Sequence, residues 1–376
     1  MMDERRKMRK RRRIRKTMGA RLIAVMAVLV LMASAMGVLR IIGRERLLAS
    51  AENTAPDMTT DETIDSIDDI MNRQTGEGLW QEGWLQYEGR IYEYNDDIMT
   101  FLIMGIDKNG EVEESQGAAD GGQADALFLV VADRRKKEIR LVGINRDTMV
   151  DINAYDAYGE GTDGSAKAQI AVQHGFGDGR ELSCELTKDA VSGLFYNLPI
   201  HGYAAVNMDA IPVINDAVGG VTLEAIEDID TDKYGKSIGK VWHEGEKIHL
   251  QGIEAYCYVR WRDREKFESA RLRLARQKQY LEAFLEKARS ETKKNITLPI
   301  RLYGDLAPYM VTDISIDETA YLAGELVGYT LAPEGIYTLS GETIRGESYE
   351  EFYPDEEALK ALMIAVFYRE VEDVSE

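Results

Sequence analysis

Ile98-Met-Thr-Phe-Leu-Ile-Met-Gly-Ile-Asp107 is an almost unbroken apolar run that ends in a carboxylate. An apolar run of this length predicts a strand buried on both faces, as in sheets that helices cover on each side. Two more apolar runs follow at residues 126–132 and 139–144, and the charged turn Asp133-Arg-Arg-Lys-Lys-Glu138 joins them. The three runs predict the middle of a buried sheet.

Helical and strand patterns alternate along the rest of the chain, without an internal repeat. The segment 252–262 fits either a short helix or a strand. The other helices are predicted at residues 166–174, 182–196, 210–218, 268–290, 317–327 and 356–370, and the other strands at 203–206, 221–225 and 336–339. This alternation predicts the α/β class, with one layered domain over residues 92–376.

The charge of the chain limits its partners. Residues 47–376 carry 32 Lys or Arg against 63 Asp or Glu, a formal charge near −31. A body this acidic repels the phosphate backbone, so nucleic acid is not expected as a partner.

The two cysteines, Cys184 and Cys257, are too few for a disulfide framework or a Cys/His zinc site. Two buried thiols and a single bridge both fit the sequence.

The N-terminal segment predicts a membrane anchor. Residues 1–16 contain ten Lys or Arg, and Leu22 to Leu39 contains no charged residue. That length is close to the ~20 residues a bilayer-spanning helix needs, and the positive-inside rule places residues 1–16 in the cytoplasm. Ala33-Ser-Ala35 also fits a signal-peptide cleavage site. The apolar run continues beyond it, which favours a retained anchor.

These patterns divide the chain into four parts, with the body outside the cytoplasm. They are a basic cytoplasmic tail at residues 1–16, a transmembrane anchor at 17–42, an acidic linker at 43–91 and an extracytoplasmic domain at 92–376.

Two aspartates flank the first two apolar runs. Asp107 ends the first run, and Asp125 directly precedes the second. Open α/β sheets collect ligands at strand ends, and two carboxylates there could share a magnesium ion that also bridges to substrate phosphates. Capping of a turn is the alternative use of each aspartate.

Arginines follow at two places. In Asn145-Arg-Asp-Thr148, Arg146 could reach a phosphate oxygen while Asp147 orients it or completes a metal shell; a surface ion pair is the alternative. A second cluster comprises Arg260, Arg262, Arg264, Arg271, Arg273 and Arg276. On an extended segment Arg260 and Arg262 point to one side, whereas Arg273, Arg276 and Gln277 share a helix face.

Such a cluster repels itself unless anions occupy it, and planar guanidinium groups suit phosphate. A solvated face balanced by neighbouring acids is the alternative. The chain contains no Gly-x-Ser-x-Gly elbow and no P-loop, and its four histidines lack zinc-type spacing. The sequence therefore favours a metal-assisted phosphate site over nucleophilic catalysis.

Taken in order, these motifs resemble the LytR-CpsA-Psr family of bacterial cell-envelope proteins. The motifs are Gly105-Ile-Asp107, Ala124-Asp125, Arg146-Asp-Thr148, Lys167, Asp216-Ala-Val-Gly-Gly-Val221, Gly252-Ile-Glu-Ala255, Val259-Arg-Trp-Arg262 and Arg273-Leu-Ala-Arg276-Gln277. The resemblance implies a three-layer α/β/α domain with a mixed central sheet, an apolar cleft for a polyprenyl tail and one preceding transmembrane helix.

The resemblance also implies a site. Asp107 and Asp125 would hold Mg²⁺, and Arg146 would act in catalysis. The acceptor hydroxyl also needs a base, and Asp147 is the candidate for that role by its position alone. The residues expected to bind a diphosphate are Arg146, Arg260, Arg262, Arg273 and Gln277.

The implied function is a membrane-anchored, Mg²⁺-dependent phosphotransferase of a Gram-positive-type bacterium. It would move a glycopolymer from a polyprenyl-diphosphate carrier to a cell-wall acceptor, peptidoglycan. Two residues depart from the family pattern: Gln123 stands where an arginine is usual, and Ala270 where an acidic residue is usual. A non-catalytic polyprenyl-phosphate-binding regulator of envelope synthesis and a polyprenyl-diphosphate hydrolase are therefore the alternatives.

Overall fold

The computed structural model describes residues 37, 39–50, 55–58, 83–115, 120–155, 161–234, 236–263 and 265–371. The predicted cytoplasmic tail, most of the predicted anchor and Arg264 lie outside these residues. Within them, no helix combines the length and the apolar character needed to cross a membrane.

A six-stranded mixed sheet forms the centre of the molecule, in the order β13-β8-β3-β4-β5-β14. The strands are β3 (Ile98–Ile106), β4 (Ala124–Asp133), β5 (Glu138–Ile144), β8 (Gly202–Asn207), β13 (Met310–Thr312) and β14 (Thr330–Thr338). The β3, β4 and β5 strands pair antiparallel, whereas β8 pairs parallel with β3 and β14 parallel with β5. The predicted buried strands and the turn between β4 and β5 are confirmed.

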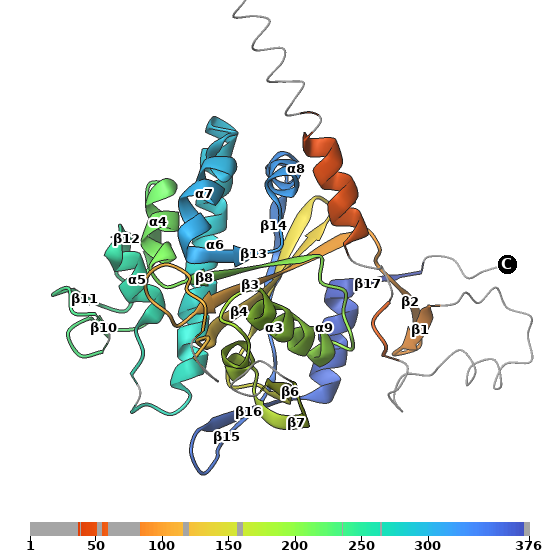
Figure 1. The fold of residues 1–376 in the computed structure, drawn as a ribbon, viewed down its shortest axis with the longest axis horizontal. Coiled ribbons are helices and arrows are strands. Elements are labelled where there is room, and N and C mark those ends of the chain that lie inside the picture. The colour runs from red at the N-terminus through yellow and green to blue at the C-terminus, as the bar shows by residue number, and fades with distance from the viewer. Residues whose placement is uncertain are drawn as a thin grey trace, which may run out of the picture.

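Helices cover both faces of this sheet and give it three layers (Figure 1). On one face α3 (Glu181–Leu194) and α9 (Glu356–Phe367) pack with the sheet into the largest apolar core. On the other face lies the long α6 (Ser269–Lys294), with α7 (Leu298–Leu306) and α8 (Ile316–Leu326) beside it. The shorter helices α4 (Ala210–Ala217) and α5 (Ile253–Arg260) join a second core with α6. The α/β/α expectation is confirmed.

Two predicted helices differ from the structure. All of 166–174 was expected to be helical, but Gly161–Gln169 forms β7, which pairs with β6 (Met149–Tyr155). Only Ile170–Phe176 is helical, as the 3₁₀ helix η1. Local propensity does not explain the difference, since Ala166-Lys-Ala-Gln169 suits a helix; antiparallel pairing with β6 overrides it. The predicted helix 356–370 ends at Phe367, because the next residues form β17 (Tyr368–Glu370) and pair with β2.

Small two- and three-stranded sheets lie outside the central sheet. They are β1 (Trp84–Tyr87) and β2 (Arg90–Tyr94) with β17, β9 (Val221–Glu224) with β12 (Lys247–Leu250), β10 (Ile229–Asp230) with β11 (Val241–Trp242), and β15 (Gly341–Arg345) with β16 (Glu350–Pro354). A second 3₁₀ helix, η2, spans Ala307–Tyr309. Cys184 and Cys257 are buried free thiols, so no bridge joins them.

Parts of the predicted linker pack on the body. Residues 39–49 form a helix whose Leu47 is buried against Tyr321 of α8, and β1 and β2 pair with the C-terminal strand. The middle of the linker, residues 59–82, lies outside the described residues. The division into tail, anchor, linker and domain stays a prediction.

Candidate active site

Asp107 and Asp125 lie side by side at one end of the sheet. The backbone N–H of Asp107 donates to the carbonyl of Gln123 (3.0 Å), and the N–H of Gln123 donates to Asp107 Oδ1 (2.7 Å). Because β3 and β5 each run antiparallel to β4, the end of β3, the start of β4 and the end of β5 meet at this edge. The predicted proximity of the two carboxylates is therefore explained by the strand order.

Arg146, in the loop after β5, is fixed by three neighbours at this edge. Its Nη1 pairs with Asp125 Oδ1, its Nη2 donates to Gln123 Oε1 (2.5 Å), and its Nε donates to Asp147 Oδ1 (3.2 Å). Gln123, which stands where the resemblance implies an arginine, therefore accepts from Arg146. An arginine there would add another positive charge beside it.

Arg273 reaches the same carboxylate from the start of α6. Its Nη1 donates to Asp125 Oδ2 (2.9 Å), and its side chain is only 7% exposed. Burial lowers the pKa of Arg273, and the nearby Arg146 and Arg262 lower it further, whereas Asp125 opposes them. The three guanidinium groups of Arg146, Arg262 and Arg273 thus lie among four carboxylates, those of Asp107, Asp125, Asp147 and Glu350. Planar guanidinium groups suit two-pronged pairing with phosphate oxygens, so they suit an anionic ligand that takes the place of a carboxylate.

Arg260 and Arg262 are held by side chains other than Asp125. Arg262 Nε donates to Ser269 Oγ (2.8 Å), at the start of α6. The sequence left an extended segment possible for Arg260, but the structure places Arg260 as the last residue of the helix α5. Its Nη1 donates to Tyr256 OH, and that hydroxyl donates to Asn109 Oδ1 (3.3 Å). Tyr256 thus links Arg260 to the loop that follows Asp107.

Arg276 and Gln277 point inward from α6. Arg276 is 1% exposed, donates to the carbonyls of Tyr258 and Trp261, and pairs with Glu227 Oε1 at 2.6 Å. It therefore holds α6 to α5 and to the loop that joins them. Gln277 Nε2 donates to the carbonyl of Val259 (3.3 Å). Arg276, one of the six arginines of the sequence cluster, therefore has a structural role and does not face the site.

Asp147 is buried in a polar network that sequence reasoning only partly identified. Its Oδ1 accepts from Gln169 Nε2 (2.7 Å), and its backbone carbonyl accepts from Phe352 N–H (2.8 Å). Burial raises the pKa of Asp147; the nearby Arg146, Arg262 and Arg273 oppose this, and the Glu350 carboxylate adds to it. A carboxylate with a raised pKa is a better proton acceptor at neutral pH.

Glu350 is the site residue that the sequence did not reveal. It lies on β16, and its carbonyl accepts from Gln169 (2.8 Å), while its Oε2 is buried without a hydrogen-bond partner among the described residues. No local sequence motif identifies Glu350 as a site residue, because β16 reaches the site only by pairing with the segment after β5.

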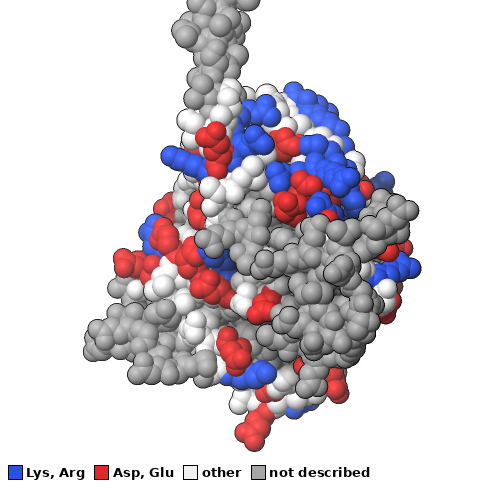
Figure 2. Space-filling view, turned by 90° about the vertical axis from the view of Figure 1, so that its right-hand side faces the viewer, with Lys and Arg blue, Asp and Glu red and all other residues white. Residues whose placement is uncertain are grey.

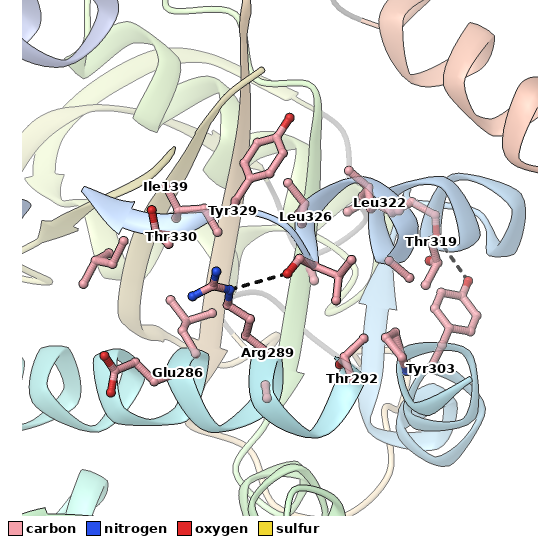
Figure 3. Close-up of a pocket in the computed structure, with 18 of the residues that line it drawn as sticks. Ile139, Glu286, Arg289, Thr292, Tyr303, Thr319, Leu322, Leu326, Tyr329 and Thr330 are labelled. Atoms are coloured by element: carbon pink, nitrogen blue, oxygen red, sulfur yellow. Dashed lines mark hydrogen bonds between the residues drawn. The ribbon is translucent and has the colours of Figure 1, made fainter. Parts of the chain in front are cut away.

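An apolar cavity of about 130 Å³ opens beside the arginines, beneath α6. Its walls include Ile103, Phe128, Val206, Tyr280 and Leu281, with Arg260, Arg273 and Gln277 at its polar side. A larger cavity of about 500 Å³ lies further along α6, between that helix, α7, α8 and the sheet (Figure 3).

Both cavities follow the same helix. From Arg273 to Thr292, α6 advances about 28 Å at ~1.5 Å per residue. The charged group and the two cavities are therefore aligned along one side of the sheet.

The two aspartates fit a magnesium ion that a substrate helps to hold. Both are hard oxygen donors at adjacent strand ends, and no group of three or more His, Cys, Asp or Glu side chains that could hold a metal occurs in the described part of the chain. Mg²⁺ commonly takes one or two carboxylates and completes its shell with water and phosphate oxygens. Two protein ligands are compatible with that pattern.

A protein-family model described as the LytR_cpsA_psr family matches residues 51–362. The chain belongs to this family. It is 25% identical over 245 residues to the polyisoprenyl-teichoic acid–peptidoglycan teichoic acid transferase TagV of Bacillus subtilis, which covers 65% of this chain and 57% of TagV. It is 28% identical over 260 residues to TagU, named as the same kind of transferase, of Oceanobacillus iheyensis, covering 67% of this chain and 71% of TagU. The chain thus spans little more than half of TagV.

Solved structures share the fold. The crystal structure of B. subtilis TagV superposes with a TM-score of 0.57 at 24% identity, covering 72% of this chain and 96% of that one. A structure described as "TagT bound to LI-WTA" gives 0.52 at 22% identity, covering 72% and 89%. At these identities the comparison supports the architecture.

We predict that Arg276→Ala destabilises the protein by about 3–5 kcal/mol, because Glu227 would remain as a partly buried charge without its partner. Arg271→Ala is the matched control, since Arg271 lies on the same helix but is 63% exposed; we expect a change within ~0.5 kcal/mol. Urea unfolding of both variants measures the difference. Equal stability of the two variants would contradict a structural role for Arg276.

We predict that Tyr256→Phe weakens diphosphate binding about tenfold, because Arg260 loses a hydrogen-bond partner. Tyr258→Phe is the matched control: it removes the same atom from the same helix, but that hydroxyl bonds Gln279. Titration with a short polyprenyl diphosphate measures both. If the two variants bind equally well, Tyr256 does not position Arg260.

Proposed function

We propose that this protein is a membrane-anchored, Mg²⁺-dependent phosphotransferase that moves a glycopolymer from a polyprenyl-diphosphate carrier to peptidoglycan, outside the cytoplasm. One observation carries the proposal. The side chains of Asp107, Asp125, Arg146 and Arg273 meet at one end of the central strands, beside an apolar cavity. The names of the TagU and TagV relatives, which act on teichoic acid and peptidoglycan, support the substrate class.

The diphosphate would occupy the positive group formed by Arg146, Arg262 and Arg273, with Arg260 and Gln277 at the cavity edge. The polyprenyl tail would then follow α6 through the apolar cavities. Burial of the tail stabilises the complex by ~0.8 kcal/mol for each methylene removed from water. The arginines would thus bind the diphosphate of the carrier, and the apolar cavities would bind its polyprenyl tail.

Arg146 and Arg273 would turn from Asp125 to the phosphate oxygens when the carrier binds. There they stabilise the negative charge that develops on the leaving polyprenyl phosphate. Asp107 and Asp125 would hold Mg²⁺, which supplies neutralisation of the same phosphate charge.

Asp147 is the proposed proton acceptor. In the proposed step, the acceptor hydroxyl oxygen bonds to the phosphorus that carries the glycopolymer, and the bond from that phosphorus to the polyprenyl phosphate breaks. The hydroxyl proton passes to Asp147, whose raised pKa favours its uptake. Arg146 Nε and Gln169 Nε2 both donate to Oδ1 of this carboxylate, which leaves Oδ2 for the proton.

Two alternatives share this site. Gln123 and Ala270 favour a non-catalytic polyprenyl-phosphate binder, because each replaces a charged residue of the family. The same groups with water as the acceptor would make a polyprenyl-diphosphate hydrolase. The acceptor dependence of turnover separates them.

We predict Mg²⁺-dependent transfer from a lipid-linked glycopolymer to peptidoglycan fragments, and a loss of about 10²–10³ in rate for Arg273→Ala, which removes a group that stabilises the developing charge. Arg271→Ala should keep the wild-type rate. Carrier consumption without added acceptor would instead indicate the hydrolase, and carrier binding without turnover the regulator.

A further inference from the structure

Charged residues in the lining of the larger cavity show where the cavity opens to solvent. Glu282, Glu286 and Arg289 of α6 border the cavity, and charged groups on an apolar wall must reach water. Arg289 Nε donates to the carbonyl of Val327, which directly follows α8 (3.4 Å; Figure 3). The mouth therefore lies between α6 and the C-terminal end of α8.

The helix at residues 39–49 packs on α8, and a side chain from its first turn reaches toward this mouth. Arg46 Nη1 pairs with Asp317 Oδ2 at 3.4 Å, near the start of α8. A Cβ added at Gly43 would collide with the Asp317 carbonyl, and one added at Gly324 would collide with the Arg40 guanidinium. The Arg40 guanidinium thus lies against residue 324, less than one helical turn from Val327. The predicted anchor, residues 17–42, overlaps the first turn of this helix.

This end of the molecule combines exposed apolar and basic side chains. Ile41 is 62% exposed, and Leu39 and Ile42 are 39% and 40% exposed. Lys137, from the turn between β4 and β5, pairs with Glu325 of α8, and Arg40 acts on the same carboxylate. In the same turn Arg135 and Lys136 are exposed. Figure 2 shows Lys and Arg gathered near the point where the N-terminal segment leaves the body.

The charged site lies at the opposite end of the sheet. Asp107 follows the last residue of β3, whereas the turn at residues 134–137 borders the first residues of that antiparallel pair. The nine residues of β3 separate the two ends by about 30 Å, at ~3.3 Å per residue. A carrier with its diphosphate at Asp125 and its tail along α6 would therefore point its tail toward the mouth.

We propose that a membrane face, made of residues 39–42, Arg135 and Lys136, rests on the headgroups of an anionic bilayer. The mouth of the larger cavity then lies at headgroup level, and the polyprenyl tail passes from the cavity into the bilayer. Basic side chains are attracted to anionic lipid, and exposed Ile and Leu side chains settle at the interface. The inference rests on the proposed function for the identity of the tail, and on the predicted anchor for the place of attachment.

Fluorescence quenching in nanodiscs tests this orientation. The full chain is reconstituted in phosphatidylglycerol/phosphatidylcholine nanodiscs that contain lipids spin-labelled at the headgroup. A fluorophore is attached at Lys136→Cys or, as the matched control, at Lys233→Cys, a lysine that is 69% exposed on the loop after β10. The native thiols are buried, which favours labelling of the introduced cysteine.

We expect strong quenching at position 136 and little at position 233. Quenching at neither position, or equal quenching at both, would overturn the proposal. Because no turnover is measured, failure of the proposed chemistry would leave this result unchanged.

A charge reversal provides the second measurement. Arg135→Glu should reduce quenching of the probe at Lys136→Cys several-fold, whereas Lys233→Glu should leave it unchanged. Undiminished quenching in the Arg135→Glu variant would show that this basic residue does not hold the face on the lipid, and would overturn its part in it.

Discussion

Asp125 lies between two guanidinium groups, and the arrangement of the site depends on this contact. Arg146 arrives from the loop after β5 and Arg273 from α6, so one carboxylate joins the sheet edge to the helix that covers it. Removing one partner from such a buried pair typically costs about 3–5 kcal/mol. The contact also keeps both arginines where a phosphate can take over from the carboxylate.

The same helix borders both parts of the proposed ligand site. Arg273 and Gln277, in its first turns, border the charged group, and the residues from Glu282 to Thr292 border the larger cavity. Arg276 fixes the helix through two carbonyls and Glu227. The buried arginine thus supports the position of its neighbour Arg273 without contacting the proposed ligand.

The sequence predicted the parts of this site that follow from strand ends. Asp107, Asp125 and Arg146 each adjoin an apolar strand pattern, so antiparallel pairing of β3, β4 and β5 was enough to bring them together. Gln169 and Glu350 could not be found in this way, because strand β7 carries a weak pattern and β16 reaches the site only by tertiary pairing. The inward direction of Arg276 was also unpredictable, since helical spacing alone does not say which face meets α5.

Lipid extraction and mass spectrometry of the purified protein would test whether the positive group and the apolar cavities form one site for a polyprenyl diphosphate. The account predicts that a polyprenyl phosphate or diphosphate copurifies with the wild-type chain and is lost from the Asp125→Ala, Arg260→Ala double variant, while Arg271→Ala retains it. Absence of such a lipid from every sample, despite folded protein, or its retention by the double variant would contradict the account.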